Sequence, residues 1–91
     1  MNSKEHIRSL MKIPGIGKSI AQDLVNIGIR QVEDLKGKDP EELFERSNEY
    51  AGAVQDRCLL YVFRCAVYFA ETKVEKQNSE KLKWWNWKDS R

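Results

Sequence analysis

The stretch Leu10-Met11-Lys12-Ile13-Pro14-Gly15-Ile16-Gly17-Lys18-Ser19 decides how this 91-residue chain folds at its start. Apolar residues recur at helical spacing before it, and again over 18–27 after it. Pro14 disfavours a helical conformation for the residue before it, while Gly15 and Gly17 allow backbone conformations with positive φ. The stretch therefore predicts a tight hairpin that joins two helices.

Helical periodicity continues after the hairpin, and no segment alternates apolar and polar residues long enough to predict a strand. Asp39-Pro40-Glu41-Glu42 has the residue types of a helix start, and we expect that helix to end near Asn48. A longer helix should begin near Ala53 or Val54 and reach Thr72. More than half of its circumference is apolar, which predicts a central helix. Its central stripe should be Leu59, Val62, Phe63, Ala66 and Phe69.

These signals predict an all-α protein with a compact five-helix domain over 1–76 and a Trp-rich tail over 77–91 that packs on it. Cys58 and Cys65 should share one helix, about 10 Å apart along its axis. That separation excludes a disulfide between them, so we expect two core thiols. With a single histidine, His6, the chain offers no set of zinc ligands.

Composition narrows the class of protein further. Hydrophobic residues make up 41% and charged residues 33% of the chain, which is too apolar for a disordered protein. The longest apolar stretch, 58–70, is interrupted by Arg64 and is shorter than the roughly 20 residues of a membrane-spanning helix. No apolar signal core follows the first residues, so we expect a cytoplasmic protein. No nucleophile–base pair or metal set supports catalysis.

The Gly-Lys-Ser element at 17–19 invites comparison with the P-loop of nucleotide hydrolases. A P-loop needs a glycine where this chain has Lys12, and a strand before the loop. The remaining interpretation is a hairpin whose backbone amides, with the start of the second helix, point at an anion. The alternative is a helix connection that serves the fold alone. The candidate anion contacts are Lys12, Gly15, Ile16, Gly17, Lys18 and Ser19.

The hairpin resembles the helix-hairpin-helix DNA-binding motif. The matching residues are Leu10, Ile13, Pro14, Gly15, Ile16, Gly17, Ala21, Leu24 and Gly28-Ile29. The whole chain resembles the small bacterial helix-hairpin-helix proteins of the pathogenicity-locus and mitomycin-resistance-like family, through 32–35, 39–43, 63–68 and 84–88. This resemblance implies an all-helical fold related to sterile-alpha-motif domains.

The resemblance also implies a function. In the family, hairpin amides contact the sugar-phosphate backbone of DNA without reading bases, often with a monovalent cation held by hairpin carbonyls. By position, these contacts would come from Gly15 to Lys18, with Ser19 in addition. DNA-binding members commonly pair two hairpins, but the second unit here, 35–40, lacks the Gly-apolar-Gly turn. DNA binding should therefore be weak.

Two other features are compatible with a second class of function, a protein-interaction adaptor. We expect no membrane partner for either function. Arg57, Tyr61, Arg64 and Tyr68 form a stripe on the long helix that is either solvated or a binding face. The second feature is the group of three tryptophans in the tail, Trp84, Trp85 and Trp87. If the rings are buried, they fasten the tail to the core as a latch; if they are exposed, they form an interface or a stacking platform for unpaired bases. We expect the latch for at least two of the three rings.

Overall fold

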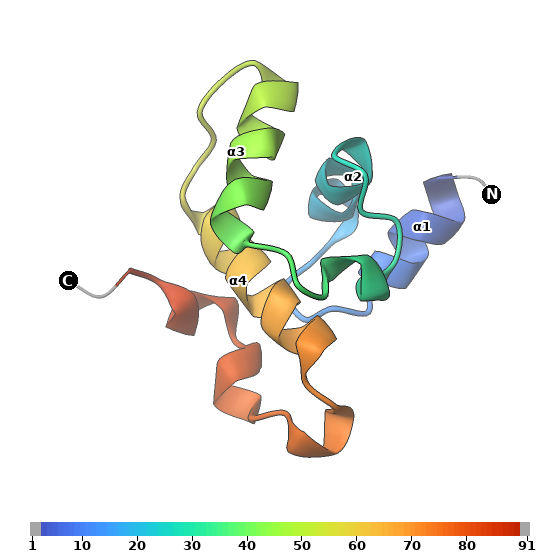
Figure 1. The fold of residues 1–91 in the computed structure, drawn as a ribbon, viewed down its shortest axis with the longest axis vertical. Helices are drawn as coiled ribbons and strands as arrows, with labels where there is room; N and C mark the ends of the chain where they lie inside the picture. Colours follow the sequence, from blue (N-terminus) through green and yellow to red (C-terminus); the bar gives the residue numbers. More distant parts are fainter. Residues whose placement is uncertain (1–2, 90–91) are drawn as a thin grey trace.

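The computed structural model describes residues 3–89, which contain four α-helices, four short 3-10 turns and no strand (Figure 1). The α-helices are α1 (Ser3–Leu10), α2 (Lys18–Asn26), α3 (Pro40–Ala51) and α4 (Cys58–Glu71). The 3-10 turns are η1 (Val32–Leu35), η2 (Val74–Lys76), η3 (Ser79–Leu82) and η4 (Trp84–Trp87). The prediction of an all-α chain is confirmed. The count of five helices is not confirmed, because residues 3–76 form four α-helices together with the 3-10 turns η1 and η2.

The predicted hairpin joins α1 to α2, which pack against each other. Ile13 and Ile16 point into the core, and the Ile16 amide donates a hydrogen bond of 3.1 Å to the Ile13 carbonyl. Gly15 lies between them with φ of +86°, a conformation that L side chains rarely adopt. Two buried isoleucines and one left-handed glycine thus set the path of the turn.

α3 begins as its sequence predicts and ends later than expected. The Asp39 carboxylate accepts a hydrogen bond of 2.9 Å from the Glu41 amide, and Pro40 occupies the first helical position. The helix continues past Asn48 to Ala51, where Gly52 takes a left-handed conformation with φ of +73°. The expected end near Asn48 is wrong because Gly52, not the falling apolar content, terminates the helix.

α4 begins at Cys58, later than the expected start at Ala53 or Val54. The Gln55 amide donates to the Asn48 side chain at 2.9 Å, which ties the segment after Gly52 back to α3. The Asp56 carboxylate then accepts a hydrogen bond of 2.8 Å from the Cys58 amide. The segment therefore turns back along α3 before the helix starts.

α4 is the central element, as predicted. Figure 1 shows it crossing the middle of the molecule, with α1, α2 and α3 on one side and the tail on the other. Phe63 is fully buried, whereas Phe69 is only partly buried at the edge of the core. Cys65 is buried as expected, but Cys58 is exposed because it lies at the solvent-facing start of the helix. The buried residues of α4 are Leu59, Leu60, Val62, Phe63, Cys65, Ala66, Val67 and Ala70.

Candidate nucleic-acid interface

The start of α2 presents backbone amides that have no partner within the helix. Gly17 is the N-cap residue, with φ of −95° and ψ of −170°, and no side chain caps the helix. In the first hydrogen bond of this helix, the Ala21 amide donates to the Gly17 carbonyl at 2.9 Å. The amides of Lys18, Ser19 and Ile20 precede that bond, so they point out of the positive end of the helix.

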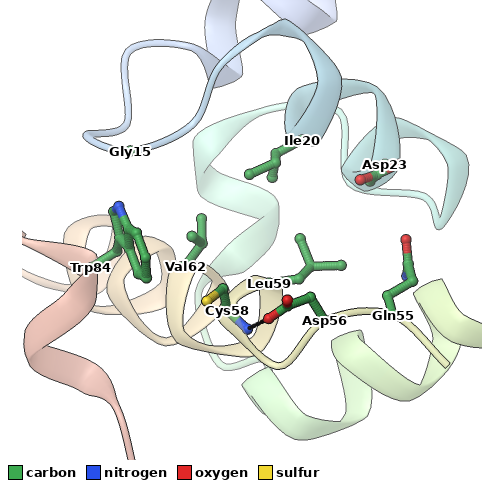
Figure 2. A pocket seen from close by; sticks show the side chains of 9 residues that line it. All are labelled: Gly15, Ile20, Asp23, Gln55, Asp56, Cys58, Leu59, Val62 and Trp84. Carbon is green, nitrogen blue, oxygen red and sulfur yellow. Dashed lines mark hydrogen bonds between the residues drawn. The ribbon is translucent and has the colours of Figure 1, made fainter.

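The two glycines of the hairpin have different surroundings. Nothing lies within 4 Å of the place where a Cβ of Gly17 would stand. A Cβ on Gly15 would stand 3.0 Å from Cδ1 of Trp84. Figure 2 shows the Trp84 indole directed toward the hairpin at Gly15. A ligand can therefore reach the backbone freely at Gly17, while Trp84 lies against the backbone at Gly15.

Of the predicted anion contacts, Ile16 does not fit. Its side chain is buried and its amide is already donated to the Ile13 carbonyl, so neither group is free for a ligand. Gly15, Gly17 and Ser19 are exposed. The groups that remain for a ligand are therefore on the Gly17 side of the turn.

Basic side chains surround this side of the hairpin. Lys12 and Lys18 are exposed and take part in no ion pair of the described residues. Lys18 lies beside Lys4 and Arg8 of α1, and these three line a cavity of about 370 Å³ together with Ile7 and Met11. Sequence reasoning missed Lys4 and Arg8 as site residues. The spacing of four residues between Lys4 and Arg8 is the signal that places both on one face of α1, whereas Lys12 lies in the turn after that helix.

On the other side of α2, toward α4, the surface is acidic. A cleft of about 330 Å³ opens there, with Asp23 and Asp56 at its lining and Ile20, Leu59 and Val62 as apolar walls (Figure 2). Burial raises the pKa of Asp23, whereas the bond from the Cys58 amide lowers the pKa of Asp56. Two carboxylates disfavour a phosphate in this cleft, so the basic side of the hairpin is the better anion site.

The predicted stripe on α4 is the surface to which the tail binds. Arg57 and Arg64 both pair with the Asp89 carboxylate, at 2.6 and 2.9 Å. Arg64 also donates to the Trp87 carbonyl at 2.8 Å. Tyr68 packs against the Trp87 ring at a centroid distance of 5.6 Å. Hydrogen bonds from Arg57 and Arg64 hold the pKa of Asp89 below its ordinary value. The stripe is therefore neither free nor merely solvated.

Both arginines of the stripe also lie over one aromatic ring. The Arg57 and Arg64 guanidinium carbons are 6.0 and 5.6 Å from the centroid of Tyr61. This is the geometry of a cation–π contact, which sets both guanidinium groups in place for Asp89. Tyr61 is thus part of the tail-binding surface.

The three tryptophans differ in exposure. Trp84 and Trp87 are partly buried, and Trp87 donates its indole N–H to the Lys81 carbonyl at 2.7 Å. Trp85 is 49% exposed and packs edge-on against Trp84, with centroids 5.8 Å apart and planes at 85°. Two rings contact the rest of the protein, as the latch interpretation requires, and the third faces solvent.

Among residues 3–89, no three His, Cys, Asp or Glu side chains gather closely enough to hold a metal ion. In the same part of the chain, no helix has the length and apolar content needed to cross a bilayer.

A protein-family model described as Cdd1, pathogenicity locus, matches residues 3–91. The chain belongs to this pathogenicity-locus family. The match extends from α1 to the end of the tail, so the hairpin and the tryptophan segment both lie within the residues that the family model matches. The family expectation drawn from the sequence is confirmed.

The pathogenicity-locus chain is also similar to the mitomycin resistance protein McrB of Streptomyces lavendulae. The two are 37% identical over 62 residues, which are 68% of this chain and 59% of that protein. The match thus spans less than two thirds of the relative's length. No solved structure gives a significant match to this chain.

Proposed function

We propose that this protein is a non-catalytic DNA-binding accessory module. In this proposal, the hairpin over 13–19 is a helix-hairpin-helix motif within a sterile-alpha-motif-like domain. Its backbone contacts the sugar-phosphate backbone of DNA and reads no bases, because amides and flexible lysines recognise phosphate and not base edges. The phosphate contacts are Gly17, Lys18 and the following amides, with Lys12 at the flank.

The single observation that supports this most strongly is the open space at Gly17. The φ and ψ angles of Gly17 are accessible to any residue, and no neighbour would meet its Cβ. Neither conformation nor packing therefore requires a glycine here. A glycine at this place does expose the backbone next to three unbonded amides, which is the arrangement that binds phosphate at helix starts.

Charge supports the same side of the hairpin. Lys4, Arg8, Lys12 and Lys18 lie around it, while the cleft with Asp23 and Asp56 lies on the other side. Each phosphate that a basic side chain neutralises contributes about −0.9 to the slope of the logarithm of the binding constant against the logarithm of the salt concentration. With at most four basic side chains at the site, the affinity can depend on salt only to a limited degree. We expect weak binding with a slope no steeper than about −4.

An amide chemical-shift titration with a short duplex tests the proposal. The amides of Gly17, Lys18, Ser19 and Ile20 should shift most in the wild-type protein. The Gly17→Ala variant should fold with a free energy of unfolding within about 1 kcal/mol of the wild type, because the backbone φ and ψ angles at position 17 suit alanine. It should nevertheless lose most of its DNA affinity, because the methyl group blocks the backbone. Shifts confined to α3 would contradict the proposal.

A second candidate function, a protein-interaction adaptor, is favoured by a different surface. Tyr50 is 66% and Val54 87% exposed at the connection between α3 and α4. Exposed apolar residues that lie close together are typical of contact surfaces. Under this alternative, the Tyr50→Ser and Val54→Ser variants would lose a partner while their DNA affinity stayed unchanged.

A further inference from the structure

We propose that Trp85, flanked by Lys83 and Lys88, is a stacking platform for an unpaired base, so that the protein prefers DNA in which a duplex adjoins single-stranded nucleotides. This inference rests on the proposed function of the hairpin and specifies its substrate. Paired bases have both faces covered in a duplex. Only an unpaired base can therefore place a face on the indole.

The fold does not account for the exposure of Trp85. Trp84 packs against Gly15 and the edge of the core, and Trp87 bonds to Lys81 and contacts Tyr68. Trp85 leaves 49% of its surface in solvent. It is the one ring of the three that the packing of the described residues leaves uncovered.

Two contacts in series connect this ring to the hairpin that carries the proposed phosphate site, by way of Gly15 and Trp84, which also line the cleft with Asp23 and Asp56. The Trp84 ring lies against Gly15 in the hairpin, and the Trp85 ring lies 5.8 Å from the Trp84 ring. A strand advances about 3.4 Å per nucleotide in B-form DNA and more when it is extended. A strand held at Gly17 therefore needs only a few further nucleotides to reach Trp85.

The segment that carries Trp85 is held in place by several bonds. The Asn86 side chain donates to the Glu80 carbonyl at 2.8 Å, and the Trp87 indole donates to the Lys81 carbonyl. Asp89 anchors the end of the segment to α4 through Arg57 and Arg64. A ring that is already fixed loses little conformational freedom when a base stacks on it.

The charge around Trp85 suits a nucleic-acid strand and not an apolar partner. The segment 81–88 contains three lysines and no acidic residue. Lys83 forms an exposed ion pair with Glu80 at 3.1 Å, which a phosphate can replace at small cost. Lys88 is exposed and is in no ion pair of residues 3–89. Lysines interleaved with an exposed aromatic ring are typical of single-strand binding surfaces.

Fluorescence anisotropy with three labelled DNAs tests the inference: a blunt duplex, the same duplex with a short single-stranded overhang, and that overhang with abasic nucleotides. The wild-type protein should bind the overhang about 5- to 100-fold more tightly than the blunt duplex. Trp85→Ala should lose this preference and keep the affinity for blunt duplex. The abasic overhang should behave as the blunt duplex does, and Trp85→Phe should restore part of the preference.

Tyr50→Ala is the matched control, because it removes another exposed aromatic ring without touching the tail. Its preference for the overhang should equal that of the wild type. If the duplex is bound but the overhang adds nothing, or if the preference survives Trp85→Ala, the inference is wrong and the function of the hairpin stands. In that case Trp85 would serve to contact a protein partner. Failure to bind all three DNAs would overturn both proposals.

Discussion

Trp84 lies so close to Gly15 that a Cβ on the glycine would stand 3.0 Å from Cδ1 of the indole. These residues are far apart in the sequence, one in the hairpin after α1 and the other in η4. The contact connects the C-terminal tail to the turn that carries the proposed phosphate site. It also makes the glycine necessary for a second reason besides its φ of +86°.

Gly15→Ala should therefore destabilise the protein by about 1 to 3 kcal/mol, from backbone strain at positive φ together with the displaced indole. Urea unfolding measures this cost. Gly17→Ala is the matched control, and it should differ little from the wild type because its conformation is ordinary and its surroundings are open. Equal costs at the two positions would contradict the assigned geometry.

The central position of α4 can be tested at its phenylalanines. Phe63 is fully buried, so Phe63→Ala should lower the free energy of unfolding by about 3 to 5 kcal/mol. Phe69 is only partly buried, and Phe69→Ala should cost clearly less. Chemical denaturation of both variants gives the comparison. A loss below about 1 kcal/mol for Phe63→Ala would contradict the assignment of α4 as the core helix.

Acid should release the tail before the domain unfolds. The folded pKa of Asp89 lies below its ordinary value of 3.8 because Arg57 and then Arg64 donate hydrogen bonds to it. Its stabilising contribution is therefore fully present above that ordinary value, and it is lost as the pH falls further, through the folded pKa. An acid titration followed by tryptophan emission should show a red shift in this window. Asp89→Asn should remove the transition, and an unchanged titration in that variant would assign it to another carboxyl group.

The two thiols should react at very different rates. Cys58 is exposed, and its hydrogen bond with Asp56 raises its pKa. Burial raises the pKa of Cys65 from 9.0 to about 11, which lowers its thiolate fraction about 100-fold near neutral pH. A disulfide reagent should therefore modify one thiol in the native protein and the second only after unfolding. Cys58→Ser should abolish the native reaction, whereas rapid modification of that variant would show that Cys65 is accessible.

Charge reversal at the hairpin should weaken DNA binding without regard to sequence. Lys18→Glu should lower the affinity for two unrelated duplexes by the same factor and reduce the salt slope by about one. Lys38→Glu, at an exposed lysine before the acidic start of α3, is the control and should change the affinity much less. Anisotropy measured across a salt series checks both. A loss that depended on the base sequence would contradict backbone recognition.

Local features of the fold were predictable because their causes lie within a few residues. The hairpin follows from Pro14 and Gly15, and the start of α3 follows from Asp39 and Pro40, since capping and turn preferences act over one helical turn. The central place of α4 follows from its apolar circumference. The start of α4 was not predictable, because Gln55 is tied to Asn48 by a hydrogen bond that periodicity does not show.

The sequence by itself determined an all-α chain, a glycine hairpin and a family, because periodicity, caps and motifs are read along the chain. Only the tertiary structure decided which surfaces are free. It places Asp89 on Arg57 and Arg64, which ties the tail to the α4 stripe, and it places Trp84 on Gly15 while leaving Trp85 exposed. These contacts join residues far apart in sequence, whose pairing depends on how the tail folds back across α4.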